Sequence, residues 1–188
     1  MGRTQLASEQ FDGRSLLDRA ISAVQAVCPR VLVISPDAAA STMPPQLEWL
    51  TPSSDADFHD AVASYDRVLI HDLACPTTPA SFLREIASAD GQAVAAVSQL
   101  TDTVKVMDAG RVAQTIERDR VVVVASPVVA DRDVITQVPR VLDALRDLAV
   151  LVELLRAITA VALRPAPAEG RRVSDPDDLR VAALRRLA

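Results

Sequence analysis

Short apolar runs alternate with stretches of helical periodicity along most of this chain, and that alternation is the strongest constraint on its fold. Buried strands are expected at residues 31–34, 67–70, 93–100, 121–124 and 160–163. Between several of these runs, apolar residues recur about every three to four positions, which is the spacing of an amphipathic helix. Strands that alternate with helices form a sheet covered by helices. The sequence therefore predicts an α/β fold, and its length suits a single domain over residues 1–188.

The helical patterns fall between these strands. Helices are predicted over residues 16–27, around 58–64, after a Thr78-Pro79 cap, over roughly 132–158, and at the C-terminus. Pro139 should bend or split the long one, because proline cannot donate the backbone hydrogen bond of a helix interior. The terminal helix is expected to begin at Asp175-Pro176-Asp177-Asp178 and to carry Arg185 and Arg186 near its end. Residues 36–57, rich in Pro, Ser and Ala, are predicted to be a loop.

Residues 103–126 break the alternation, because consecutive strand-like runs follow one another there without an intervening helix. The turn Asp108-Ala109-Gly110 joins the first two runs and predicts a hairpin. A hairpin without a covering helix should project from the body or extend a sheet edge. We expect a β-arm over about residues 103–120.

The composition excludes several classes of protein. Residue types with apolar side chains make up 49% of the chain but aromatic ones only 3%, so Val, Leu, Ile and Ala must build the core. No run of about 18 apolar residues predicts a membrane span, and charged residues interrupt the N-terminal segment where a signal peptide would be apolar. A net charge of −5 argues against general nucleic-acid binding. We expect a cytoplasmic protein with reduced thiols at Cys28 and Cys75.

Two charged positions stand out as candidates for an anion-handling site. Asp72 follows the predicted strand 67–70, at the strand end where open α/β sheets place ligands. Lys105 is the only lysine among 20 basic residues, and the other nineteen are arginines. A mechanism that needs a second lysine, for instance to hold a nucleotide triphosphate, is therefore excluded. From position alone, Asp72 could equally cap a loop, and Lys105 could be a solvated charge on an exposed hairpin. His71 is expected to pack at the strand end rather than act as a base.

Several motifs, in this order, resemble the 2-C-methyl-D-erythritol 4-phosphate cytidylyltransferase family. His71 to Pro76 resembles the family's His-Asp-Ala-Ala-Arg-Pro, and residues 102–105 match its Asp-Thr-Val-Lys. Residues 115–118 are similar to Thr-Val-Asp-Arg, residues 126–128 to Thr-Pro-Gln, and residues 172–179 to Lys-Val-Thr-x-Pro-Glu-Asp-Leu. The resemblance runs from about residue 8 to the C-terminus. It implies a three-layer, Rossmann-like nucleotidyltransferase sandwich with a protruding β-arm.

The family's glycine-rich loop, Ala-Ala-Gly-x-Gly-x-Arg, and the strand before it have no counterpart in the sequence. In the family, this loop cradles the triphosphate of CTP. The five glycines here are never clustered. Cys75 and Val128 also replace the Arg and Gln of two motifs. The expected differences therefore concentrate on the nucleotide side, and an upstream start codon would remove the largest of them.

The resemblance also implies roles for the retained residues. Asp72 matches the aspartate that serves the sugar alcohol and the metal, for which the resemblance implies Mg²⁺. The side chains expected around the sugar-phosphate are those of Thr103, Lys105, Arg118 and Arg172, and Ser126 is expected to bind the cofactor. Arg172 keeps the positive charge of the family's lysine. Its planar guanidinium donates hydrogen bonds in a fixed fork, whereas a lysine ammonium is a compact point charge. The arm is expected to join two subunits into a homodimer and to contribute Arg118 across the interface.

Three hypotheses follow from the sequence. The first is a divergent relative that keeps the sugar-phosphate side but is inactive or weakly active. The second is an active cytidylyltransferase with another acceptor. The third is a non-catalytic partner that dimerises with an intact paralogue or regulates it.

Overall fold

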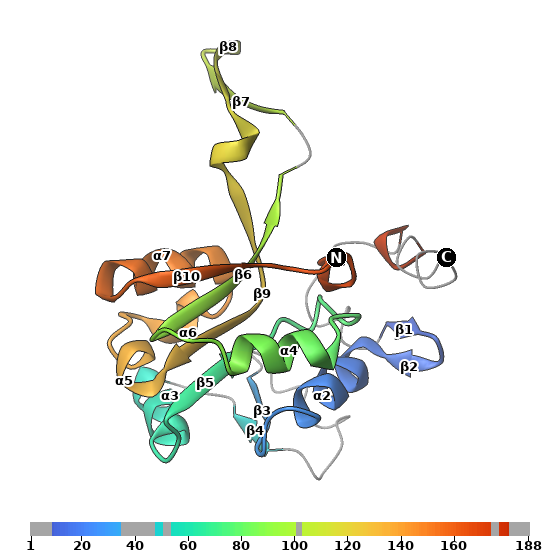
Figure 1. Ribbon diagram of the computed structural model, residues 1–188, viewed down its shortest axis with the longest axis vertical. Helices are drawn as coiled ribbons and strands as arrows, with labels where there is room; N and C mark the ends of the chain where they lie inside the picture. The colour runs from blue at the N-terminus through green and yellow to red at the C-terminus, as the bar shows by residue number, and fades with distance from the viewer. Residues whose placement is uncertain (1–8, 35–47, 51–53, 101–102, 174–176, 181–188) are drawn as a thin grey trace.

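A four-stranded mixed sheet forms the centre of the protein (Figure 1). The computed structural model describes residues 9–34, 48–50, 54–100, 103–173 and 177–180. The strand order is β10-β6-β9-β5, with bounds Val161–Pro165, Ala93–Gln99, Val122–Asp131 and Arg67–Ile70. Strand β9 runs antiparallel to both β5 and β6, whereas β10 is parallel to β6. The prediction of an α/β fold is confirmed.

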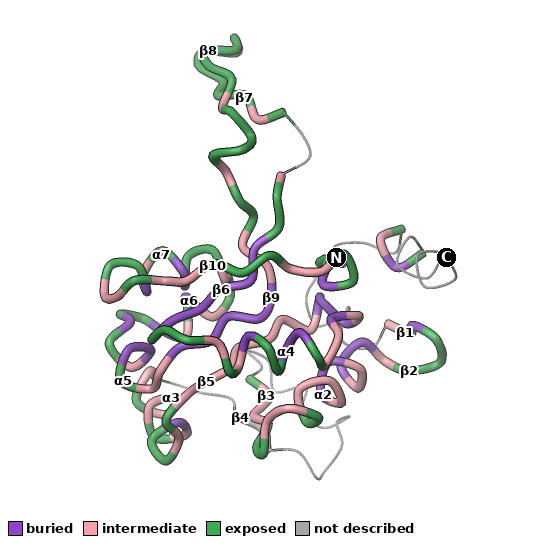
Figure 2. The backbone as a smooth tube through the Cα atoms, viewed as in Figure 1, coloured by how far each residue is buried: buried purple, intermediate pink, exposed green. Residues whose placement is uncertain are grey.

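Strand β6 is the most buried segment of the sheet (Figure 2). Residues 93–97 are all buried, although their side chains alternate between the two faces. A strand covered on both faces needs an unbroken apolar run of small and β-branched residues, and Ala-Val-Ala-Ala-Val provides it. The sheet must therefore carry helices on both sides.

Two apolar clusters confirm this three-layer arrangement. One cluster joins alternate residues of β6 and β9 to helices α3 (Asp55–Val62), α5 (Arg132–Ile135), α6 (Val141–Ala144) and α7 (Leu148–Ile158). The other joins Val94, Ala96 and Val129 to Phe82 and Ile86 of helix α4 (Ala80–Ala87). Because neighbouring residues of one strand enter different clusters, each cluster occupies one face of the sheet.

The predicted long helix is split, as expected, around Pro139. Three separate helices, α5, α6 and α7, replace it, and Arg140 adopts a left-handed conformation with a φ of 52° directly after the proline. Asp147 then caps α7, because its carboxylate accepts a hydrogen bond from the backbone N–H of Ala149 at 2.9 Å. The proline therefore ends one helical segment and lets the chain turn before the next.

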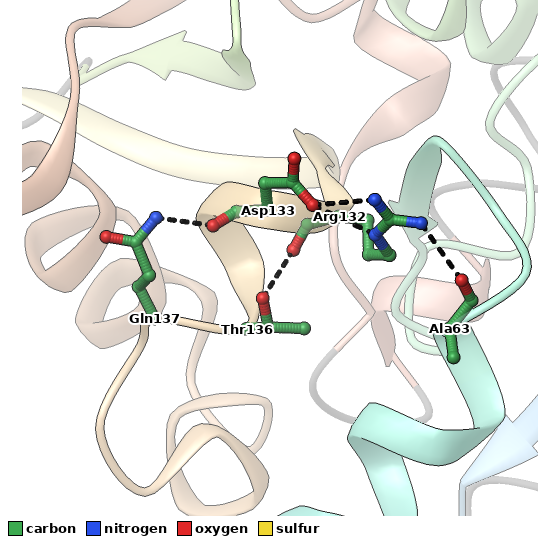
Figure 3. Close-up of polar contacts among 5 residues, drawn as sticks. All are labelled: Ala63, Arg132, Asp133, Thr136 and Gln137. Carbon is green, nitrogen blue, oxygen red and sulfur yellow. Dashed lines mark hydrogen bonds and ion pairs between the residues drawn. The ribbon is translucent and has the colours of Figure 1, made fainter.

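Arg132 ties helix α5 to the end of helix α3 (Figure 3). Its Nη1 donates to the carbonyl oxygen of Ala63 at 2.9 Å, while Nε donates to Asp133 Oδ1 at 2.9 Å. The hydroxyl of Thr136 donates to the Arg132 carbonyl, and the Gln137 side chain donates to the Asp133 carbonyl. One arginine thus holds together two helices on the same face of the sheet.

Among the described residues, three strand pairs lie outside the central sheet, and one of them is the hairpin over residues 104–116. Strands β1 (Gln10–Phe11) and β2 (Arg14–Ser15) form an antiparallel pair before helix α2 (Leu16–Gln25), which corresponds to the predicted helix 16–27. Strand β3 (Leu32–Ile34) matches the predicted strand 31–34 and pairs in parallel with β4 (Glu48–Leu50). The prediction of a loop throughout residues 36–57 is wrong at β4 and at the start of α3. Residues 35–47 and 51–53 lie outside the described part of the chain.

The predicted Thr78 cap is also wrong. Helix α4 begins at Ala80, and Pro79 occupies the N-cap position. The hydroxyl of Thr78 instead donates to the carbonyl oxygen of Cys75 at 3.0 Å, and the residue is buried. Thr78 therefore stabilises the turn before the helix. The proposed start of the terminal helix at Asp175 and Pro176, and its arginines Arg185 and Arg186, lie outside the described residues. Residues 177–180 are helical.

The predicted β-arm is confirmed. Strands β7 (Val104–Asp108) and β8 (Arg111–Ile116) form an antiparallel hairpin that projects from the body (Figure 1). Ala109 and Gly110 make its turn with φ values of 45° and 77°, a conformation that favours glycine. A short 3₁₀ helix, η2 (Arg118–Arg120), leads back into β9, which starts one residue after the predicted start and extends well beyond the predicted end.

Candidate functional site

Asp72 lies where strand β5 leaves the sheet, as predicted. The last registered pair between β5 and β9 is Ile70 with Val128. If this antiparallel register is continued by two residues, Asp72 falls opposite Ser126 of β9. The sheet geometry therefore brings together two residues that are 54 positions apart in the sequence.

The Asp72 side chain and backbone are held by four contacts, one of which is the hydrogen bond that its carbonyl oxygen accepts from the Cys75 backbone N–H at 2.9 Å. Its Oδ1 accepts a hydrogen bond from the Ala74 backbone N–H at 2.9 Å, which closes a local turn. Its Oδ2 lies 3.2 Å from Arg172 Nε. Its own backbone N–H donates to Ser126 Oγ at 2.9 Å. The carboxylate is 19% exposed, so it is oriented by the fold and still reachable from solvent.

Arg172 approaches from the segment after β10 and the 3₁₀ helix η3 (Ala168–Gly170). The Val173 backbone N–H donates to the Ala74 carbonyl at 2.7 Å, and Val173 is buried. The Thr77 hydroxyl donates to the Glu169 carbonyl at 2.6 Å. These bonds fasten the Arg172 segment to the loop after β5. The arginine side chain itself is 49% exposed, so the ion pair contributes only about 1 kcal/mol or less to stability.

His71 and Ser126 lie directly beneath this ion pair. Ser126 is 1% exposed, and its Oγ lies 2.7 Å from His71 Nδ1. Burial lowers the pKa of His71 to about 4, against the opposing effects of the Asp72 carboxylate and the Cys75 backbone. The imidazole is therefore uncharged at neutral pH, which agrees with the expectation of a packed strand-end residue.

Cys75 occupies the position of the family's arginine and has no reactive character. Its side chain is 2% exposed. Burial, assisted by the Asp72 carboxylate, raises the pKa of the Cys75 thiol to about 12, although Arg172 and the Ser126 backbone act in the opposite direction. Because the thiolate is the nucleophile, this thiol is inert at neutral pH. Cys28 is half-buried.

The predicted site residues separate into two groups. Asp72, Ser126 and Arg172 meet at the sheet edge. Thr103, Lys105 and Arg118 instead belong to the exposed arm or its base, and Arg118 lies 3.9 Å from Asp119. The arm projects away from the body of the protein (Figure 2). Asp102, which precedes Thr103 in the motif, lies outside the described residues.

The acidic groups available to a metal ion are few. Among the described residues, no cluster of three or more His, Cys, Asp or Glu side chains could hold a metal. Asp72 offers one carboxylate. Mg²⁺ commonly takes one or two carboxylates together with phosphate oxygens of a ligand. Asp72 therefore fits a Mg²⁺ site only if a bound phosphate completes it. No helix in the described part of the chain is long and apolar enough to cross a membrane.

Comparison with known proteins decides the family. The family model for 2-C-methyl-D-erythritol 4-phosphate cytidylyltransferase matches residues 57–183, which include the Asp72 loop, the arm and Arg172. The chain belongs to this family.

A curated 2-C-methyl-D-erythritol 4-phosphate cytidylyltransferase from Frankia casuarinae is 41% identical over 117 residues. The match covers 60% of this chain and 43% of that protein, so it spans less than half of the relative's length.

Two solved structures of similar fold come from bacterial relatives. The 2-C-methyl-D-erythritol 4-phosphate cytidylyltransferase from Thermus thermophilus superimposes with a TM-score of 0.75 at 24% identity, covering 97% of this chain and 94% of that one. The 4-diphosphocytidyl-2C-methyl-D-erythritol synthase from Anaerococcus prevotii gives a TM-score of 0.72 at 17% identity, with 95% and 88% coverage. At these identities the likeness establishes the nucleotidyltransferase fold alone.

Sequence reasoning assigned Ser126 to cofactor binding and gave His71 no partner. The structure places the Ser126 hydroxyl against His71 and the Asp72 backbone, beneath the surface of the site. The sequence feature that could have indicated a buried, hydrogen-bonded hydroxyl is the Ser-Pro pair inside an apolar strand. A buried hydroxyl in such a strand needs a partner, but only the register of β5 against β9 identifies that partner.

Proposed function

We propose that this protein binds 2-C-methyl-D-erythritol 4-phosphate through Asp72 and Arg172, as a cytidylyltransferase-like member of the non-mevalonate isoprenoid pathway. The observation that carries the proposal is the half-exposed Arg172 guanidinium, held 3.2 Å from Asp72 at the end of β5. A guanidinium matches a phosphate through paired hydrogen bonds, and a carboxylate accepts hydrogen bonds from sugar hydroxyls. The pair therefore offers complementary groups to both ends of a phosphorylated polyol.

The geometry leaves Arg172 able to receive a phosphate. Its contact with Asp72 uses Nε, and the described residues accept no hydrogen bond from its Nη groups. The backbone of the Arg172 segment is already fastened through Val173 and Glu169, so binding does not have to order it. When bound, Mg²⁺ would shield the phosphate charge, and Asp72 is the residue that would hold it.

The 188-residue polypeptide is proposed to be weak or inactive in cytidylyl transfer when assayed by itself. Transfer to the α-phosphorus of CTP depends on positioning and on neutralising the triphosphate. These 188 residues contain one lysine and five dispersed glycines, so the groups that would cradle three linked phosphates are few. Formation of a CDP-alcohol by the purified polypeptide at the rate of an intact relative would favour an active cytidylyltransferase instead.

Replacement of Arg172 by alanine tests the binding proposal. Removing the guanidinium should weaken binding of 2-C-methyl-D-erythritol 4-phosphate by about 10-fold or more, because a charge-assisted hydrogen bond contributes about 1.5–3 kcal/mol. Titration calorimetry with and without Mg²⁺ measures the change. Arg164→Ala is the matched control, since Arg164 is an exposed arginine within strand β10 and its side chain donates to the Leu163 carbonyl rather than to Asp72. Equal affinities for the two variants would contradict the assignment of Arg172.

We also propose a homodimer formed through the arm. Apolar side chains that are at least 40% exposed concentrate on the arm and its base: Val106, Met107, Val112, Val122 and Val123. Met107 and Val112 lie opposite each other in the hairpin. An exposed apolar surface of this kind is typical of an interaction site. A second copy is the proposed occupant, and in that assembly Arg118 could approach the partner's Asp72 loop.

The double substitution Met107→Ser and Val112→Ser tests this interface. Both side chains are exposed, so the subunit fold should survive while the dimer dissociates at least about tenfold more readily. Sedimentation velocity over a concentration series measures the dissociation constant. Leu163→Ser provides the control, because Leu163 is 41% exposed on β10 and distant from the arm. A wild-type protein that stays monomeric at high concentration would refute the proposal.

A further inference from the structure

Two hydrogen bonds link the half-buried imidazole of His71 to the backbone of Asp72. His71 Nδ1 lies 2.7 Å from Ser126 Oγ, and that oxygen accepts the Asp72 backbone N–H at 2.9 Å. The same Asp72 turns its Oδ1 to Ala74 N–H and its Oδ2 to Arg172. The hydroxyl of Ser126 thus replaces the backbone partner that Asp72 loses when β5 leaves the sheet.

The hydrogen of the Ser126 hydroxyl favours one direction for its hydrogen bond to the ring. The hydroxyl oxygen already accepts a hydrogen from Asp72, and it carries a single hydrogen of its own. Among the hydrogen bonds of the described residues, His71 Nδ1 is the partner that can accept that hydrogen. The tautomer that uses it has Ser126 as the donor, Nδ1 as the acceptor and the ring proton on Nε2.

We propose that His71 is a positioning residue, which acts through Ser126 to hold Asp72 in the orientation that receives a sugar-phosphate. This inference rests on the proposed function and adds two residues to its site. Neither residue touches the ligand. Ser126 is 1% exposed, and both ring nitrogens of His71 are turned away from solvent, one towards Ser126 and the other buried in the interior.

The contacts around the ring explain how this device works. By accepting the Ser126 hydrogen, His71 Nδ1 fixes the direction of the Ser126 hydroxyl. That hydroxyl holds the Asp72 backbone N–H at the start of the turn that presents the carboxylate to Arg172.

Four substitutions separate positioning from packing. Ser126→Ala and His71→Phe remove the donor or the acceptor, and each should weaken binding of 2-C-methyl-D-erythritol 4-phosphate by about 10- to 100-fold, as expected when the partners that orient a binding group are lost. Ser126→Thr keeps the hydroxyl, and His71→Asn keeps an acceptor near the position of Nδ1. These two conservative variants should stay within about threefold of wild type in the same calorimetric titration.

A double-mutant cycle shows whether the effect passes through Asp72. In an Asp72→Asn background, the carboxylate to be positioned is gone, so adding Ser126→Ala should change the affinity by less than about twofold. If Ser126→Ala weakens binding equally in both backgrounds, the hydroxyl acts by another route and the inference is wrong.

Two readouts are independent of ligand binding. Amide hydrogen exchange at Asp72 should accelerate at least about tenfold in Ser126→Ala, because its N–H loses its acceptor. Nitrogen-15 spectra of the His71 ring should show an unprotonated Nδ1 and a protonated Nε2 at neutral pH. An unchanged exchange rate or the opposite tautomer overturns the inference. If both readouts agree while wild type fails to bind the sugar-phosphate, the proposed function is the part that is wrong.

Discussion

Acidification from pH 7 to pH 4 is expected to remove on the order of 3 kcal/mol of folding free energy through His71 alone. Burial lowers the pKa of His71 from 6.5 to about 4 in the folded protein. The unfolded chain therefore takes up a proton on this ring between about pH 6.5 and pH 4, while the folded protein does not. The stabilisation is complete above pH 6.5 and is lost as the pH falls towards 4.

Urea denaturation of wild type and His71→Asn at pH 7, 5 and 4 measures this contribution. The two proteins differ in this one side chain, so the difference between the pH dependences of their free energies of unfolding isolates His71. The expected result is a shallower loss of stability in His71→Asn. The same substitution at His59, the other histidine, controls for a general effect of removing an imidazole. Parallel pH profiles for wild type and His71→Asn would show that the ring is not held uncharged by the fold.

Strongly patterned elements could be predicted from the sequence because their signal is local. Strand β5 has the predicted bounds, since the run Val68-Leu69-Ile70 is apolar and is followed by a polar pair. The turn at Gly110 and the split near Pro139 follow from the conformations that single residues favour or forbid. Strand β4 was not predicted, because it has three residues, Glu48–Leu50, in a segment whose composition is typical of a loop. Three residues are too few to show the alternation of apolar and polar side chains that indicates a strand.

The site could be predicted only in part, because its contacts connect distant segments. Asp72 and Arg172 are 100 residues apart, and no periodicity in the sequence indicates that they meet. Motif resemblance placed both in one site. The partner of Ser126 depended instead on the register between β5 and β9, which neither strand's own sequence specifies. The sequence therefore indicated which residues matter, and the sheet register determined what each one contacts.

Truncation of Leu155 to alanine is expected to destabilise the protein by about 2–5 kcal/mol, the range for removing a buried leucine side chain from a core. Leu155 lies on α7, is 0% exposed and belongs to the cluster that packs the helices against β6 and β9. With only 3% aromatic residues in the chain, this cluster consists mainly of aliphatic side chains that close packing must fill. Loss of three side-chain carbons there leaves a cavity that short neighbouring helices cannot close without breaking contacts of their own.

Val150→Ala on the same helix separates this packing effect from a general effect on helix α7. Val150 is 44% exposed, so its truncation removes little buried surface, and alanine favours the helix more than valine does. We expect its free energy of unfolding, measured by urea denaturation at pH 7, to stay within about 0.5 kcal/mol of wild type. If both variants lose the same stability, α7 contributes through its backbone rather than through Leu155. If neither variant loses stability, the residues under α7 are not the main core. The apolar cluster on the α4 side of the sheet then contributes most of the free energy of unfolding.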